Sequence, residues 1–276
     1  MIVEFTLPIL LGLVVGLLVT GAMAGVLAGL LGVGGGIVIV PVLIIVAELF
    51  KIDDSIAMLL VVGTSLATII PTSISSARAH QKRGAIDPAI LRGWVPAIFL
   101  GALIGGIASK YIGSAGLTLI FGAVALVVSV NLALPKTLTL AAEPPASRAK
   151  QSAIALPIGF TSALMGIGGG TLSVPVMSML SVPVHRAVAT ASVFGLAIAV
   201  PAVCGFVWAG LGVEGRPPGS LGYVNLPAAV TLFSMSVLTA PYGAKIAHLM
   251  APRKLKLAFA VFLAISAARM LWKSVV

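Results

Sequence analysis

Residues 32–41 read GVGGGIVIVP, and residues 166–175 read GIGGGTLSVP, so Gly32 corresponds to Gly166. In both stretches a glycine triplet is followed five residues later by a proline, Pro41 and Pro175. A further proline pair, Pro88 and Pro227, is separated by a similar interval. One glycine triplet arises readily by chance in an apolar chain, whereas two at equivalent places indicate a duplication. We therefore predict two related halves.

The composition excludes a soluble domain. Hydrophobic residues make up 59% of the chain and charged residues 9%, and the mean hydropathy is +1.19. Soluble domains carry about 25% charged residues. Apolar runs of about 18 or more residues recur, which is typical of membrane-spanning helices. These runs lack the period-two alternation of a β-barrel. The single cysteine, Cys204, excludes a disulfide-stapled domain. The sequence predicts an all-α polytopic protein surrounded by membrane lipid.

Charges and helix breakers divide the chain into ten apolar segments. The first half holds approximately 6–31, 37–50, 55–76, 88–109 and 114–134; the second holds 153–166, 171–182, 187–211, 225–249 and 255–273. We therefore expect a first repeat over residues 1–134, a cytoplasmic linker over 135–152 and a second repeat over 153–276. No cleavable signal is expected, because residues 1–4 lack a basic region and the first apolar segment continues to Leu31.

The net charge of +10 is spread over the predicted loops, which indicates membrane orientation rather than nucleic-acid binding. Arg78, Lys82 and Arg83 lie between the third and fourth segments, so this loop is predicted to face the cytoplasm. Five segments per half is an odd number, so the second half should be inverted relative to the first. Both termini are then expected on the outer side, and the expected location is the inner (cytoplasmic) membrane.

The segments that follow the glycine triplets are short. Residues 37–50 and 171–182 span only about 21 and 18 Å as helices, whereas a crossing needs about 20 residues. We therefore predict two re-entrant hairpins, one from each side, with tips that meet near the midplane. Six full crossings with two hairpins, or eight to ten crossings, remain compatible with the sequence.

The glycine triplets are the first candidate site. Each precedes a helix, so its N–H groups and the positive helix end are suited to an anion. The alternative is close helix packing, which small residues permit in membranes. The six candidate residues are Gly34, Gly35, Gly36, Gly168, Gly169 and Gly170.

Hydroxyl groups supply further candidates, because they donate to an oxyanion without trapping it by a permanent charge. Thr64 and Ser65 lie in the first half, and Thr190 and Ser192 lie in the second. The alternative is a hydrogen bond to a carbonyl of their own helix.

Few ionisable residues lie within the segments. Lys245 and Arg269 are the only cations well inside helical runs, and Lys245 is the candidate anion ligand. Either side chain is alternatively able to extend to a membrane interface. No acidic residue lies in the middle of a segment, which disfavours a carboxylate-based cation or proton site. The sequence also lacks the motifs of nucleotide-binding loops, serine hydrolases and zinc proteases. We expect no enzyme activity, no catalytic residue, no metal and no cofactor.

The duplicated glycine motif resembles that of the TauE/SafE sulfite exporter family. Residues 63–67 (GTSLA) and 73–84 (SISSARAHQKRG) are also similar to that family, and the resemblance covers essentially the whole chain. It implies a small membrane protein that moves sulfite, sulfonates or related anions, often outward. The second half departs from the pattern, because residues 189–192 read ATAS where a Thr-Ser pair would match the first half.

We thus expect a secondary transporter that exports a small sulfur-containing anion, held at the midplane between two glycine-rich hairpins. A passive anion channel and a non-transporting membrane subunit of a complex are the alternatives. The expected partners are the small anionic substrate and lipid, without nucleic acid, and a homo-oligomer is compatible with the sequence.

Overall fold

The structure, a computed structural model, describes residues 7–134, 141, 145, 147–247, 249 and 253–275. The described residues form nine helices and one short β-hairpin. They are α1 (Leu7–Leu31), α2 (Gly36–Leu49), α3 (Asp54–Gln81), α4 (Pro88–Ala133), α5 (Arg148–Met165), α6 (Gly170–Met179), α7 (Val184–Gly210), β1 (Ser220–Leu221), β2 (Val224–Asn225), α8 (Leu226–Ala247) and α9 (Arg253–Val275).

This is an all-α polytopic membrane protein. Among the described residues, α1, α3, α4, α7 and α8 are long and apolar enough to cross a membrane. On α1, Leu11, Val15 and Val19 recur every four residues, and each is more than half exposed. Such a stripe of exposed large apolar side chains suits contact with lipid.

All ten predicted segments are helical, and two of them belong to α4. Gly113 interrupts this helix with φ 71° and ψ 176°, and the arms on either side match the fourth and fifth segments. A side chain at positive φ would be strained, so glycine suits this break. The fit is poorer elsewhere. α5 begins at Arg148, before the expected start at residue 153, and its exposed first turn accommodates Arg148 and Lys150. The β1–β2 hairpin was not predicted.

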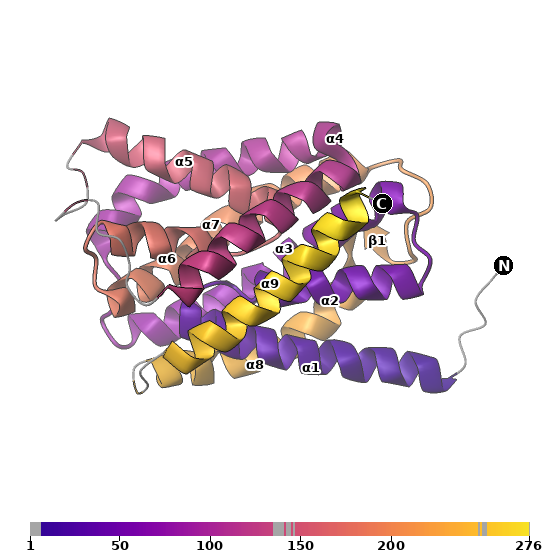
Figure 1. Ribbon diagram of the computed structural model, residues 1–276, viewed down its shortest axis with the longest axis horizontal. Coiled ribbons are helices and arrows are strands. Elements are labelled where there is room, and N and C mark those ends of the chain that lie inside the picture. The colour runs from indigo at the N-terminus through magenta and orange to yellow at the C-terminus, as the bar shows by residue number, and fades with distance from the viewer. Residues whose placement is uncertain are drawn as a thin grey trace.

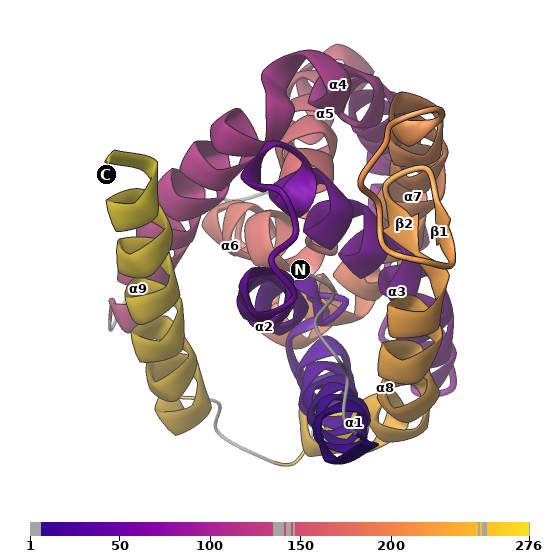
Figure 2. The same cartoon turned by 90° about the vertical axis from the view of Figure 1, so that its right-hand side faces the viewer.

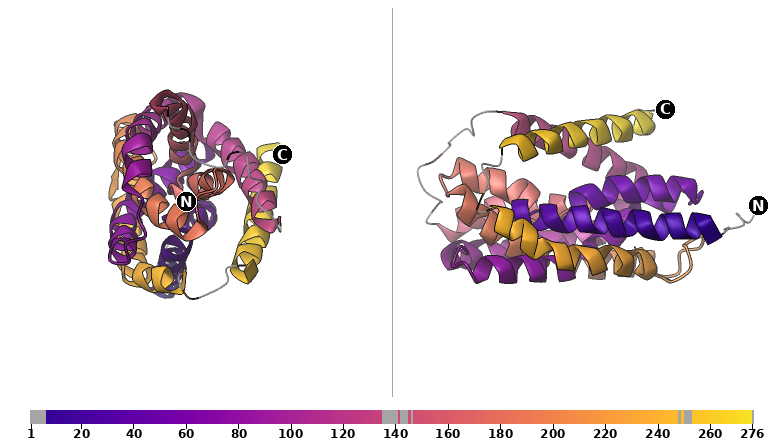
Figure 3. Two further views of the ribbon diagram at one scale, coloured as in Figure 1. Left: turned by 90° about the vertical axis from the view of Figure 1, so that its left-hand side faces the viewer. Right: turned by 90° about the horizontal axis from the view of Figure 1, so that it is seen from below.

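Most helices lie along the long axis of the molecule, whereas α9 and the second arm of α4 run obliquely to it (Figure 1). One end holds the α3–α4 junction, the start of α5, the α6–α7 junction and the end of α8 (Figures 1 and 3). We call it the basic end, because Arg78, Lys82 and Arg83 lie at the α3–α4 junction. The opposite end holds the α2–α3 junction, the β-hairpin and the end of α9.

The two predicted halves are interleaved rather than separate. α1 packs against α8, and α5 packs against the first arm of α4. The first helix of each half therefore contacts the fourth segment of the other half. Glycine permits both approaches: a Cβ on Gly25 would meet the Ser236 carbonyl oxygen, and one on Gly159 would meet that of Ile98. α1 thereby packs on the second half and α5 on the first. α9 packs against α4 and stands on the opposite side of the molecule from α8 (Figure 2).

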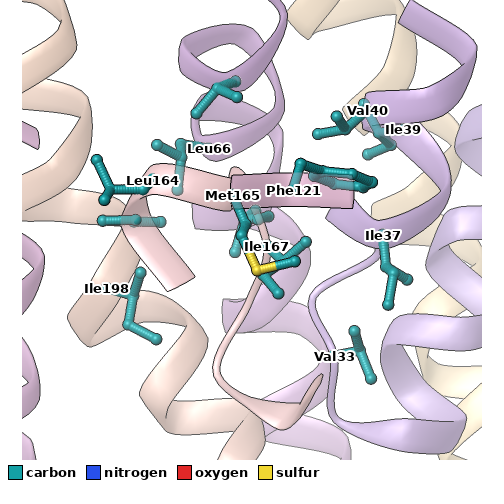
Figure 4. Close-up of a cluster of buried hydrophobic side chains, with 14 of the residues drawn as sticks. Val33, Ile37, Ile39, Val40, Leu66, Phe121, Leu164, Met165, Ile167 and Ile198 are labelled. Carbon is teal, nitrogen blue, oxygen red and sulfur yellow. The ribbon is translucent and has the colours of Figure 1, made fainter. Parts of the chain in front are cut away.

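The core is built around the two glycine motifs. Every residue from 30 to 41 and from 162 to 171 is buried. Val33 and Ile37 from the first motif share one apolar cluster with Met165 and Ile167 from the second (Figure 4). The glycine motifs therefore lie in the interior, where the backbone must pack closely.

Candidate functional site

Two glycine turns reverse the chain in the interior. Residues 32–36, the first turn, join α1 to α2, and residues 166–170, the second turn, join α5 to α6. α2 runs back toward the end of the molecule at which α1 begins (Figures 1 and 3). In the first turn, Gly34 and Gly35 have φ values of 72° and 81°, which favour glycine. In the second turn the equivalent of Gly35, Gly169, has φ −57°. The two turns thus share a sequence pattern but not a backbone conformation.

The turns contact each other reciprocally. A Cβ built on Gly36 would meet the carbonyl oxygen of Gly166, and one built on Gly170 would meet that of Gly32. Gly36 corresponds to Gly170, and Gly32 corresponds to Gly166, so the two contacts are equivalent in the two motifs. Gly34 and Gly168, which are equivalent to each other, also meet: a Cβ on Gly34 would lie 3.1 Å from the Gly168 Cα. The close-packing role anticipated for the glycines is therefore present.

The turns also carry unbonded backbone donors. Within the described residues, the N–H groups of Gly34, Gly35 and Gly36 donate no hydrogen bond, and neither do those of Gly168, Gly169 and Gly170. The first bonds that close the two helices come from Val38 N–H to Gly35 O (3.1 Å) and from Ser173 N–H to Gly169 O (3.0 Å). Buried unbonded N–H groups are rare and costly, and a helix N-terminus attracts negative charge. Six backbone N–H groups of the turns are therefore left without an acceptor in the described part of the chain.

Two hydroxyl groups beside the second turn were not predicted. Ser162 Oγ and Thr171 Oγ1 are buried and have no hydrogen-bond partner. A signal was present in the sequence, because the equivalent residues of the first half, Ala28 and Ile37, are apolar. A crevice of about 310 Å³ between α4, α5 and α6 reaches Thr171 and is otherwise lined mostly by apolar residues. An unpaired buried hydroxyl costs about 1–3 kcal/mol, so a ligand that pairs with it would recover that cost.

Of the four predicted hydroxyl residues, only Ser65 bonds to a turn. Its Oγ donates to the Gly166 carbonyl at 2.7 Å, and both residues are buried. Ser192 Oγ donates instead to the Ala189 carbonyl of its own helix at 2.6 Å.

Thr64 and Thr190 have equivalent roles at the starts of two helices. Thr64 Oγ1 accepts from the N–H of Asn225, just before α8, at 2.9 Å. Thr190 Oγ1 accepts from the N–H of Asp87, just before α4, at 3.0 Å. The structural equivalent of Thr64 is therefore Thr190, and Ala191 stands where the first half has Ser65.

The two cations predicted within helical runs lie on the surface. Lys245 is exposed in the last turn of α8, in contrast to the buried turns. Arg269 on α9 is half exposed and donates to Glu48 on α2 at 2.6 Å. Neither charge is buried with the glycine turns.

Two more unpaired polar groups lie behind the turns. The Trp94 ring stacks on Phe194 with centroids 5.9 Å apart, and its Nε1 is buried without a partner. Phe194 in turn contacts the second turn, because a Cβ on Gly169 would lie 2.5 Å from the Phe194 Cβ. Ser73 Oγ is likewise unpaired and packs against Gly195. Trp94 lies on α4 and is connected to the second turn through Phe194 of α7, and Ser73 lies on α3 beside α7.

Comparison with known proteins identifies the family. A profile described as "Sulfite exporter TauE/SafE" matches residues 17–270. A probable membrane transporter protein of Haemophilus influenzae is 31% identical over 247 residues, which cover 88% of this chain and 92% of the relative. Another, from Methanocaldococcus jannaschii, is 27% identical over 88% of this chain and 89% of its own length. A third, from Bacillus subtilis, is 33% identical over 58% of this chain and 66% of its own length. No solved structure matches the chain. Since the profile match extends over nearly the whole sequence, the chain belongs to the TauE/SafE sulfite exporter family.

Proposed function

We propose that the protein is a secondary transporter that exports a small sulfur-containing anion, such as sulfite or a sulfonate, across the inner membrane. The observation that carries this proposal is the meeting of two buried helix N-termini whose glycine N–H groups are unbonded. The family description and the names of the relatives support a transporter of this class.

The donor set suits an oxyanion that must be released again. Backbone N–H groups and the free hydroxyls of Ser162 and Thr171 are able to donate hydrogen bonds to an anion without a full positive charge. The segments 30–41 and 162–171 contain no charged residue, so the site has no counter-ion to hold the substrate permanently. An inside-negative potential drives an anion outward by about 2.3 kcal/mol per charge per 100 mV, which favours export.

The reciprocal contacts support two inverted halves with re-entrant hairpins. In this proposal α1–α2 enters from the outer face and α5–α6 from the cytoplasmic face, at the basic end. Rocking of one half against the other would open the turns to each side alternately. The termini would then both lie outside.

The test is flux of sulfite into liposomes that hold only this purified protein, with sulfonates as competitors. We compare the wild type with the double variant Ser162→Ala/Thr171→Val, which removes two unpaired hydroxyls; Thr171→Val keeps the side-chain shape and Ser162→Ala removes only the oxygen atom. Its stability should be unchanged or higher, because no hydrogen bond is lost, whereas sulfite transport should show a raised KM. Ser109→Ala is the matched control, since the Ser109 hydroxyl bonds to the Gly106 carbonyl of its own helix.

Three results would count against the proposal. An unchanged KM in the double variant would remove Ser162 and Thr171 from the site. Large unitary currents without counterflow would indicate a channel. Absence of flux for every anion with a folded protein would indicate a non-transporting subunit.

A further inference from the structure

A basic groove lies between α3 and α8, separate from the glycine turns. Its volume is about 690 Å³. Ile74 and Arg78 of α3 line it together with Lys82 and Arg83, which follow α3, and Val237 and Pro241 form the wall on α8. The groove therefore combines an apolar part with a cluster of three cations at the basic end.

The groove opens on the outside of the helix bundle. The inward face of α3 is formed by Thr72, Ser76 and His80, which are all about 1% exposed. The groove residues lie on the opposite face of the same helix. On α8, the neighbouring Leu238 and Tyr242 are 62% and 67% exposed. An outer apolar surface next to an aromatic residue and several cations is typical of a membrane interface.

The cations of the groove are available to a ligand. No acidic residue lines the groove. Within the described part of the chain, Arg78 and Lys82 form no ion pair, and Arg83 uses Nη1 for the Ala79 carbonyl at 2.9 Å. Lys245 lies one helical turn beyond Pro241 and adds a further charge at the same end. Attraction to the negative end of α3 accounts for cations at this position, but it does not account for a cavity beside them.

We propose that this groove binds one anionic phospholipid. Arg78, Lys82 and Arg83 bind its phosphate, and an acyl chain lies along Ile74 and Val237. Basic pockets between membrane helices suit such headgroups. The apolar wall would gain nothing from a free inorganic anion, whereas it can contact an acyl chain. This lipid site does not depend on the transported substrate, so it is tested separately from the proposed function.

The test is native mass spectrometry of the detergent-solubilised protein with added phosphatidylglycerol or phosphatidylcholine. We expect one tightly bound phosphatidylglycerol and weaker binding of phosphatidylcholine. Arg78→Gln/Lys82→Gln should weaken phosphatidylglycerol binding roughly 30-fold, from about 1 kcal/mol per basic residue. Lys51→Gln/Lys110→Gln removes the same charge at the opposite end of the molecule and should leave binding unchanged.

A second variant tests the cavity itself. Ile74→Trp keeps every cation but fills the groove, and it should also weaken phosphatidylglycerol binding. Equal binding by the two charge variants, or unaltered binding by Ile74→Trp, would overturn the proposal. Displacement of the lipid by millimolar inorganic phosphate would instead assign the cations to a free anion.

Discussion

Gly34 offers a direct test of the crossing between the two turns. In Gly34→Ala the new Cβ would lie 3.0 Å from Ile69 Cγ2 and 3.1 Å from the Gly168 Cα. The Ile69 side chain has some freedom to move, but the Gly168 backbone belongs to the opposite turn. The methyl group would therefore push the two turns apart.

Two costs add in this variant. A non-glycine residue at the φ of 72° costs about 1–2 kcal/mol, and overpacking of a tight interior costs about 1–3 kcal/mol. The expected loss of unfolding free energy is thus about 2–5 kcal/mol. Gly84→Ala is the matched control, because Gly84 has φ 63° but no atom within 4 Å of its built Cβ. Only the backbone cost of about 1–2 kcal/mol applies there.

Thermal unfolding of both variants in the same detergent measures the difference. At roughly 2–4 °C per kcal/mol for a chain of about this size, Gly34→Ala should unfold several degrees below Gly84→Ala. Sulfite flux should fall in Gly34→Ala and persist in Gly84→Ala. Equal unfolding midpoints would refute the reasoning, because they would mean that the turns do not meet closely at Gly34.

Three further predictions concern hydrogen bonds and charges around the bundle. Thr64→Val and Thr190→Val each leave a backbone N–H, of Asn225 or Asp87, without its acceptor, so each should lower the unfolding free energy by about 1–3 kcal/mol. Ser192→Ala should lower it less, because the Ser192 hydroxyl bonds only to its own helix. Unequal effects of the two threonine variants in thermal unfolding would contradict their equivalence. Arg269→Gln removes an exposed ion pair with Glu48 and should cost less than about 1 kcal/mol with unchanged flux; a large loss of flux would give Arg269 a role in transport. Burial raises the pKa of the Tyr223 phenol above its ordinary value of 10.0, so its contribution to stability is complete below pH 10 and is lost as the pH rises further. Tyr223→Phe should therefore lose less unfolding free energy than the wild type as the pH rises above 10. Identical curves of stability against pH for the two proteins would contradict this role of Tyr223.

Local signals predicted the helices well. All ten segments are helical, because apolar runs and helix breakers act over a few residues, and even the break at Gly113 fell between two predicted segments. The meeting of the glycine motifs was likewise expected, from the two predicted hairpins that enter from opposite sides, and the turns do contact each other. Inversion of the halves and re-entry of the hairpins stay predictions.

The sequence did not predict which residues, distant in the chain, would form hydrogen bonds with one another. Thr64 and Thr190 were selected as anion donors, but each accepts a backbone N–H from a residue 161 or 103 positions away. The different conformations of Gly35 and Gly169 likewise depend on their separate surroundings, because identical glycine triplets precede α2 and α6. Ser162 and Thr171 stand out only when the two halves are compared position by position.

The reciprocal packing of the turns has a consequence for biosynthesis. Several backbone groups that pack against the first turn, among them the Gly166 carbonyl and the Gly168 Cα, belong to the second half of the chain, which is synthesised later. At about 5–20 residues per second, the nascent first hairpin waits roughly 7 to 27 seconds for its counterpart. During that interval its glycine amides lack the surroundings of the finished core. The packing around the first turn is therefore completed only when the second hairpin is synthesised, and the order of synthesis makes the second hairpin the step that completes this part of the core.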